Sequence, residues 1–130
     1  MLDASALLEI LLQTRRAERL MQRALAASER IHAPELLDIE AVSALRRLHL
    51  RNELSAERAA QALEDLSCLA IQRHAHGPLL GRIWELRDAM TAYDAAYVVL
   101  AEALDAPLLT CDGRLARAHG HGAKIELIDA

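Results

Sequence analysis

The sequence predicts an α/β fold: one domain over residues 1–130, with a central parallel sheet and helices on both of its faces. Short apolar runs alternate with longer segments whose apolar residues recur at helical spacing, a pattern typical of βαβ units. Apolar residues make up 53% of the chain and charged residues 26%, which indicates a compact core. No linker, repeat or low-complexity tract divides these 130 residues into smaller parts.

Seven helices are predicted from apolar residues that recur every three to four positions. In chain order they span residues 5–11, 15–27, 34–50, 56–67, 78–87, 91–104 and 113–118. Pro34 suits the first turn of its helix, because a backbone N–H at that position would have no helical partner. Ser55 and Thr91 are suitable N-caps, since each hydroxyl can accept a bond from an N–H of the first turn.

The strands are the short apolar runs between these helices. They are predicted at residues 1–2, 31–33, 69–71, 108–111 and 125–128. Strands that alternate with helices are expected to pair in parallel, and both faces of the sheet are then covered. In open sheets of this kind, ligands bind beyond the carboxyl ends of the strands. Asp3 and Asp112 directly follow predicted strands and therefore fall at that edge.

Composition argues against several classes of function. The net charge is −4, which disfavours non-specific binding to duplex nucleic acid, and 2% aromatic residues are too few for an extended base-stacking platform. Cys68 and Cys111 lack zinc-site spacing and suit a reducing compartment. No apolar run could span a bilayer, so we expect a cytoplasmic protein without membrane association. The sequence has no P-loop, GxGxxG or GxSxG motif, which argues against a nucleotide cofactor and against a serine hydrolase.

Four acidic residues occupy unusual positions. Asp3 and Asp112 follow strands, Asp94 faces the apolar side of its helix, and Glu40 borders a buried stripe. Each alone could be an ordinary N-cap or a helix-start acid. Two carboxylates about 4 Å apart repel by roughly 4 kcal/mol at an effective dielectric near 20, so four converging acids require protons or divalent cations. Oxygen ligands suit Mg²⁺ or Mn²⁺, which can activate a water for attack at phosphorus.

Basic residues and histidines leave alternatives open. Candidate phosphate contacts are Arg46, Arg47, Arg82 and Arg87, although each could equally belong to a solvated helix face. The histidine pairs at positions 74/76 and 119/121 could bind Zn²⁺ or Ni²⁺, but they are more typical of surface loops. Asp38 lies two residues from Glu40 on a different helix face and is interpreted as structural or surface-exposed.

Four sequence blocks carry a resemblance to a known family. They are D-A-S-A-L at 3–7, A-P-E-L-L-D-I-E at 33–40, T-A-Y-D-A-A-Y at 91–97 and L-L-T-C-D at 108–112. In this order and spacing they resemble the signature blocks of PIN-domain ribonucleases, most closely the VapC toxins of type II toxin–antitoxin pairs. The resemblance implies strand order 3-2-1-4-5, in which the first and fourth strands are neighbours. Because only Met1 and Leu2 precede Asp3, the first strand is unusually short for a central one.

The resemblance also implies a mechanism: Mg²⁺-dependent endonucleolytic cleavage of RNA that leaves a 5′-phosphate and a 3′-hydroxyl. Carried over by position, the acidic quartet and metal ligands are Asp3, Glu40, Asp94 and Asp112. Ser5 and Thr110 match the hydroxyl positions that orient carboxylates or water. The alternative is a catalytically silent PIN fold that binds RNA or a protein; retention of all four acids argues against it.

Partners follow from the same resemblance. It implies a transfer or ribosomal RNA substrate, a homodimer, and a VapB-type antitoxin that masks the acidic cleft. A lysine or arginine of that antitoxin would neutralise the carboxylates and block the metal. The expected dimer surface is the aliphatic face of the second and fourth helices, around Leu20, Met21, Leu63 and Leu66.

Overall fold

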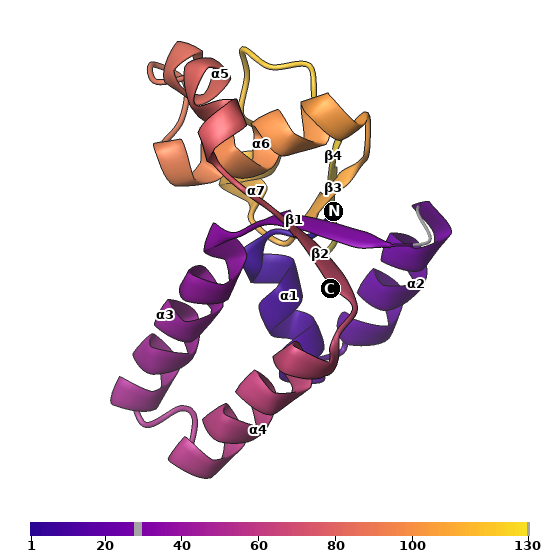
Figure 1. Cartoon of the computed structure of the whole chain (residues 1–130). Helices are drawn as coiled ribbons and strands as arrows, with labels where there is room; N and C mark the ends of the chain where they lie inside the picture. The colour runs from indigo at the N-terminus through magenta and orange to yellow at the C-terminus, as the bar shows by residue number, and fades with distance from the viewer. Residues whose placement is uncertain (28–29, 130) are drawn as a thin grey trace.

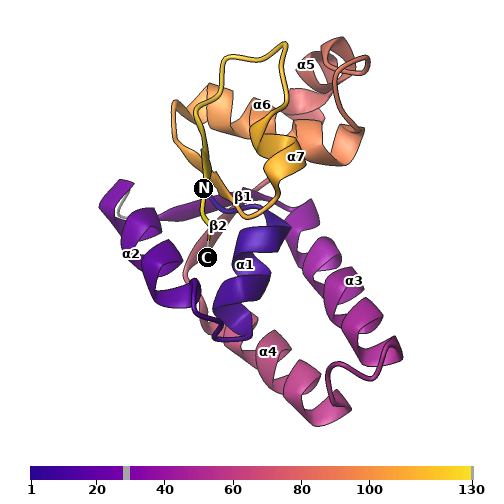
Figure 2. The same cartoon turned by 180° about the vertical axis from the view of Figure 1, so that it is seen from behind.

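The computed structural model describes residues 1–27 and 30–129, and it has the predicted α/β architecture (Figure 1). The helices are α1 (Ala4–Leu11), α2 (Ala17–Ala27), α3 (Leu36–Leu50), α4 (Ala56–Cys68), the 3₁₀ turn η1 (Gly77–Leu79), α5 (Leu80–Glu85), α6 (Ala92–Leu104) and α7 (Gly113–Ala116). The strands are β1 (Ile31–Pro34), β2 (Ile71–His74), β3 (Leu108–Thr110) and β4 (Ile125–Leu127). Helices α1, α3 and α4 lie on one side of β1 and β2, with α5 and α6 on the other, so both faces are covered (Figures 1 and 2).

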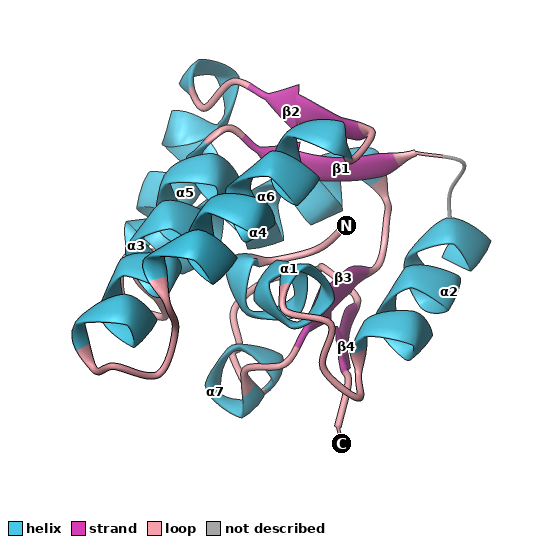
Figure 3. Ribbon diagram, turned by 90° about the horizontal axis from the view of Figure 1, so that it is seen from below, coloured by secondary structure: helices cyan, strands magenta, loops and turns pink. Residues whose placement is uncertain are grey.

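All described strands pair in parallel. β1 pairs with β2 from Ile31 opposite Ile71, and β3 pairs with β4 from Leu108 opposite Ile125. The first strand is reduced to a bridge between Leu2 and Leu109, with the N-terminal segment lying between the two strand pairs (Figure 3). In the predicted order 3-2-1-4-5, strand 1 is the segment at Leu2, strands 2 and 3 are β1 and β2, and strands 4 and 5 are β3 and β4. The neighbours 3-2, 1-4 and 4-5 of that order are thus present. Among the described residues no ladder joins Leu2 to β1, because Leu2 provides a single bridging residue.

The helix starts follow local chemistry, and both predicted N-caps are confirmed. The Ser55 hydroxyl accepts a hydrogen bond from the Arg58 N–H at 3.1 Å, and the Thr91 hydroxyl accepts one from the Asp94 N–H at 3.2 Å. Each bond satisfies an N–H that has no partner within the helix. The cap at Thr91 positions Asp94 in the first turn of α6.

Pro34 was predicted to lie in the first turn of α3. It instead ends β1, opposite His74. An extended conformation there lets the next N–H, that of Glu35, donate to the His74 carbonyl at 2.9 Å, and α3 then begins at Leu36. The strand predicted at 69–71 runs instead over Ile71–His74. Local apolarity marked its start, but pairing with β1 decides where a strand extends.

Two clusters of buried side chains form the core. The larger one is centred on α6, whose residues 95–101 are all buried. The smaller one packs α2 against the first bridge and β3, through Leu20, Leu2 and Leu109. Leu20 is 0% exposed and Leu66 is 6% exposed, so these two side chains fill the core and cannot belong to the predicted dimer face. Of the other two residues of that face, Leu63 is 39% exposed and Met21 is half-buried. Within the described ranges, no helix is both long and apolar enough to cross a membrane.

Candidate active site

Asp3 is the most buried of the four candidate acids, with 5% of its surface exposed. It caps α1, and its Oδ1 accepts hydrogen bonds from the Ser5 hydroxyl at 2.6 Å and from the Ala6 N–H at 2.9 Å. Its Oδ2 accepts a bond from the Thr110 hydroxyl at 2.5 Å. Burial raises the pKa of the Asp3 carboxyl, because the charged form loses hydration, while these donors oppose the rise. Both oxygens of this carboxylate are therefore held in place.

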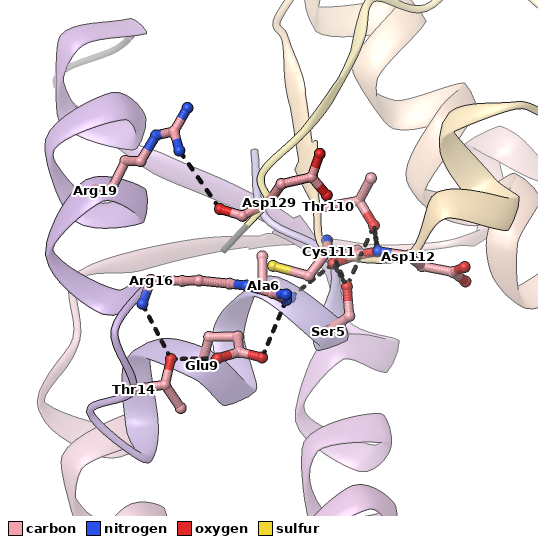
Figure 4. Close-up of polar contacts among 11 residues, drawn as sticks. Ser5, Ala6, Glu9, Thr14, Arg16, Arg19, Thr110, Cys111, Asp112 and Asp129 are labelled. Carbon is pink, nitrogen blue, oxygen red and sulfur yellow. Dashed lines mark hydrogen bonds and ion pairs between the residues drawn. The ribbon is translucent and has the colours of Figure 1, made fainter.

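Ser5 and Thr110 tie the start of α1 to the end of β3 (Figure 4). Their hydroxyl oxygens lie 3.2 Å apart, and each donates its proton to Asp3. Ser5 Oγ accepts from the Cys111 N–H and Thr110 Oγ1 accepts from the Asp112 N–H, both at 3.0 Å. The turn that carries Asp112 is thus fixed by the same two hydroxyls that hold Asp3.

Asp94 and Asp112 are less enclosed and share one basic neighbour. Asp112 caps α7, with its Oδ1 accepting from the Arg114 N–H at 2.9 Å. The Arg114 Nη2 atom lies 3.5 Å from Asp94 Oδ2 and 3.7 Å from Asp112 Oδ2, although its side chain is 74% exposed. Burial is the main cause that raises the pKa of Asp94; repulsion from Asp112 adds to it, and Arg114 opposes it. An exposed cation compensates this pair only weakly.

Glu40 enters the site from α3 and is held from α6. It is half-buried, and the Tyr97 hydroxyl donates a 2.6 Å hydrogen bond to its Oε1. Burial raises the pKa of Glu40 first, and repulsion from Asp94 and Asp3 raises it further. The pKa of Tyr97 is raised by burial and by the Glu40 carboxylate, so this phenol stays protonated and remains a donor.

Mutual repulsion links all four acids. Asp112 raises the pKa of both Asp3 and Asp94, and Asp3 and Asp94 raise that of Glu40. Among the described residues, however, no three His, Cys, Asp or Glu side chains lie close enough to hold one ion directly. An all-oxygen set of this kind fits a hydrated divalent cation, since Mg²⁺ keeps several waters and binds through one or two carboxylates. The donors do not fit a closed, dehydrated metal cage.

The four candidate phosphate contacts have different environments. Arg46 and Arg47 are exposed on α3, and Arg47 is on the same side of the molecule as Glu40 because both line one groove. Arg82 is engaged by Glu85 at 3.1 Å and by Glu102 at 3.0 Å. Arg87 stacks over the Trp84 ring, 4.6 Å from its centre.

The histidines and Asp38 make structural contacts. The ring nitrogens of His74 and His32 lie 2.9 Å apart, and His76 accepts a bond from the Leu36 N–H. His121 contacts the Ala118 carbonyl and the Ala123 N–H. Asp38 forms a two-point ion pair with Arg73, at 2.6 and 2.8 Å, which confirms its interpretation as a structural residue.

Two residues of the site were missed by the sequence prediction. Tyr97 appeared only as the last residue of the third sequence block, although a buried tyrosine usually requires a partner for its hydroxyl, and Glu40 provides one. Arg114 lies two residues after Asp112 and was not singled out. Its sequence context carried no signal, because its contact with Asp94 depends on how α6 and α7 pack.

A groove adjoins this site between α1 and α3. It encloses about 770 Å³, and its walls include the apolar side chains of Leu8, Leu36 and Ile39. Ser5 and Glu40 also line it, so the groove opens onto the candidate acids. Ile39 is 71% exposed, which is unusual for an isoleucine and leaves an apolar wall facing solvent.

The family model described as "PIN domain" matches residues 1–120. This chain belongs to the PIN domain family. It is 39% identical to "Ribonuclease VapC12" of Mycobacterium tuberculosis over 127 residues, which cover 98% of this chain and 97% of the relative. It is 44% identical to "Ribonuclease VapC1" of the same species over 127 residues (97% and 95%), and 46% identical to "VapC ribonuclease Mb0985" of Mycobacterium bovis over 113 residues (87% and 85%).

The family assignment confirms the resemblance carried by the four sequence blocks. The part of the chain that matches the PIN domain model contains all four candidate acids and both hydroxyl residues. In this PIN domain the acids come from four separate places: the start of α1, α3, the first turn of α6 and the start of α7.

Proposed function

We propose that this chain is a metal-dependent endoribonuclease that acts as the toxin of a type II toxin–antitoxin pair, with residues 1–130 forming one PIN domain. The supporting observation is that three of its four candidate acids have raised pKa values, because burial disfavours their charged forms and repulsion among the acids adds to this effect. Like charges held together in this way are unfavourable unless a cation or protons compensate them. Relatives that cover nearly the whole chain are named ribonucleases.

Asp3, Glu40, Asp94 and Asp112 would hold the cation, which we propose is Mg²⁺ with Mn²⁺ as a possible substitute. A bound cation of this type supplies positive charge that acidifies a water and offsets the charge that develops on phosphate oxygens. Ser5 and Thr110 keep both Asp3 oxygens oriented. Glu40 would contribute Oε2 to the cation or its water, because Tyr97 binds its Oε1.

The test is Asp94→Asn, because the amide removes the charge and preserves the shape. We expect RNA cleavage in Mg²⁺ to fall by at least about 100-fold, the size of effect typical when a transition-state interaction is removed. Asp38→Asn is the matched control, since Asp38 pairs with Arg73 outside the site. Cleavage by Asp94→Asn at the rate of the unmodified protein would refute the assignment of the site.

A catalytically silent PIN domain that binds RNA or protein is the competing function. It predicts that the unmodified protein leaves RNA intact in Mg²⁺ and Mn²⁺, and that titration calorimetry with Mn²⁺ shows no binding. Cleavage that stops on addition of EDTA and returns with excess Mg²⁺ would exclude it.

We propose transfer or ribosomal RNA as the substrate, which also places the protein in the cytoplasm. Arg47 is the favoured phosphate contact, because it lines the same groove as Glu40, with Arg46 next to it on α3. Arg82 and Arg87 are weaker candidates, since carboxylates or an aromatic ring already engage them. Sequencing the 5′ ends of RNA fragments after brief induction would identify the target, and Arg47→Gln should raise KM for that RNA.

We propose that the groove between α1 and α3 receives an apolar helix of a VapB-type antitoxin, with a basic residue that reaches Glu40. The groove is apolar where Leu8, Leu36 and Ile39 line it, and acidic where it meets the site. Burying a charged side chain on that wall would be costly. Ile39→Asp should therefore abolish co-purification with the antitoxin while cleavage persists. The matched control is Leu50→Asp, an exposed apolar position on the same helix that does not line the groove.

A homodimer is also proposed, and its surface cannot be centred on Leu20 and Leu66, because both are buried. The exposed apolar residues Leu80 and Trp84, at 58% and 66%, lie next to each other around α5 and are the better candidates. Trp84→Glu should convert a dimer into a monomer in sedimentation velocity. If Trp84→Glu remains dimeric, the interface lies elsewhere.

A further inference from the structure

We infer that Tyr97 is a positioning residue of the active site: its hydroxyl holds Glu40, the one acid that α3 contributes, in register with the three acids from other elements. This inference rests on the proposed nuclease function, but it concerns a residue that contacts an acid and not the substrate. Its geometry is defined by two side chains, the Tyr97 phenol and the Glu40 carboxylate, whose oxygens are 2.6 Å apart.

Tyr97 is itself rigidly placed. It is 2% exposed and belongs to the buried face of α6, the most enclosed helix of the fold. A ring packed on all sides has little freedom to rotate, so the position of its hydroxyl is set by the core. An ionised carboxylate can only accept a hydrogen bond, so the phenol is the donor to Glu40.

From its own helix Glu40 receives a charge attraction from Arg47, the weakest influence on its pKa, and no side-chain hydrogen bond among the described residues. It is half-buried on α3, and among the described residues the Tyr97 bond is the only side-chain hydrogen bond between α3 and α6. The neighbouring acids Asp3 and Asp94 repel it. Without the phenol donor, a glutamate with three rotatable bonds would turn away from this negative region or take up a proton. Either change removes a correctly placed charged ligand.

A second consequence concerns which oxygen is available. The phenol occupies Oε1, which leaves Oε2 for a cation, its water or a proton. Partners that orient a ligand carboxylate in this way typically change metal affinity or activity by about 10- to 100-fold when they are removed. Tyr97 thus adds to the four acids a hydrogen-bond donor, which is buried in α6, the helix that also carries Asp94.

The experiment compares Tyr97→Phe with Tyr93→Phe. Both remove one hydroxyl from α6, but Tyr93 is 66% exposed, and within the described part of the chain its hydroxyl makes no hydrogen bond. Titration calorimetry with Mn²⁺ alone should show about tenfold weaker binding for Tyr97→Phe and no change for Tyr93→Phe. In RNA cleavage, kcat should fall by about the same factor, while KM for RNA stays constant.

A double-mutant cycle with Glu40→Ala separates positioning from packing. If Tyr97 acts through Glu40, adding Tyr97→Phe to Glu40→Ala should cause no further loss of Mn²⁺ affinity or kcat. Equal losses with and without Glu40 would overturn the inference, as would unchanged Mn²⁺ affinity in Tyr97→Phe. Thermal unfolding of each variant checks the fold. Glu40→Gln keeps an acceptor for the phenol and serves as the variant that retains the hydrogen bond to Tyr97.

Failure of this inference can be told apart from failure of the proposed function. The calorimetric readout does not need RNA cleavage, and Asp94→Asn provides the reference for loss of the site. If Asp94→Asn abolishes Mn²⁺ binding while Tyr97→Phe leaves it unchanged, the metal site stands and the role of Tyr97 is refuted.

Discussion

The two ends of the acid site are built in opposite ways. Asp3 is almost fully buried, and neutral donors from Ser5, Ala6 and Thr110 saturate its carboxylate. The Asp94 carboxylate, by contrast, is paired with Arg114 at 3.5 Å from an exposed side chain, and a hydrogen bond to Thr91 has the smallest influence on its pKa. One acid is thus part of the folded core, whereas the other is held loosely.

This difference indicates a division of labour. A carboxylate fixed by hydroxyl and amide donors is preorganised and needs no rearrangement when a cation arrives. A carboxylate paired with an exposed arginine can change partner at little cost, because such pairs contribute only about 0–1 kcal/mol. We expect mutations at the Asp3 end to affect both stability and activity, and mutations at the Asp94 end to affect activity alone.

The largest expected effect breaks the Asp3 end. Asp3→Ala removes the N-cap of α1 and leaves the Ser5 and Thr110 hydroxyls without their acceptor, so the free energy of unfolding should fall by about 2–4 kcal/mol. Asp94→Asn should be no less stable than the unmodified protein, because it removes a repelled charge. Urea denaturation of both variants measures the difference; equal destabilisation would contradict the division.

Thr110→Val tests the hydroxyl itself at nearly constant volume. The side chain is fully buried, and its loss leaves Asp3 Oδ2 and the Asp112 N–H unpaired, which should cost about 1–3 kcal/mol. Thr110→Ser keeps the hydroxyl and serves as the control for packing. Greater destabilisation by the serine than by the valine would show that volume, and not hydrogen bonding, matters at this position.

The stability of the metal-free protein should depend on pH, because three of the four acids have raised pKa values. Asp3, Glu40 and Asp94 have raised pKa values in the fold, so the metal-free protein should lose stability as pH rises above about 4 through those values. The buried Met1 amino group, with a pKa lowered to about 6, acts in the opposite direction between about 6 and 8. Chemical denaturation in EDTA should therefore show a smaller decline for Asp94→Asn than for the unmodified protein, and excess Mg²⁺ should abolish the difference.

Replacing Arg114 should have the smallest effect. Its guanidinium opposes any cation that approaches Asp94 and Asp112, so Arg114→Gln should bind Mn²⁺ about two- to fivefold more tightly at low salt. Arg46→Gln, which removes an equal charge from exposed α3, is the control. Weaker Mn²⁺ binding by Arg114→Gln would mean that this arginine supports the metal site instead of competing with it.

Much of the fold was predictable because it depends on local chemistry. The N-caps at Ser55 and Thr91 follow from hydroxyls that precede helical segments, and the buried run of α6 follows from its apolar residues. The extended end of β1 at Pro34 was not predictable in this way. Its conformation depends on pairing with β2, where its partner His74 lies 40 positions further along the chain.

The apolar surface shows the same limit. Helical spacing identified Leu20 and Leu66 as apolar stripe residues, but whether a stripe faces the core or a partner depends on the elements packed against it. The structure buries both and exposes Ile39, Leu80 and Trp84 instead. A sequence pattern shows which residues share one face of a helix, but whether that face is buried depends on the elements packed against it.

Residue type, order and spacing were enough to predict the class of the fold and the family, and to select four candidate acids. The packed core was needed to show that hydroxyls enclose Asp3, that Arg114 lies beside Asp94 and Asp112, and that Tyr97 holds Glu40. The two kinds of interaction differ in range, because capping and periodicity act within a turn or two of backbone. Hydrogen bonds across 57 or 107 positions of sequence exist only once the core has packed.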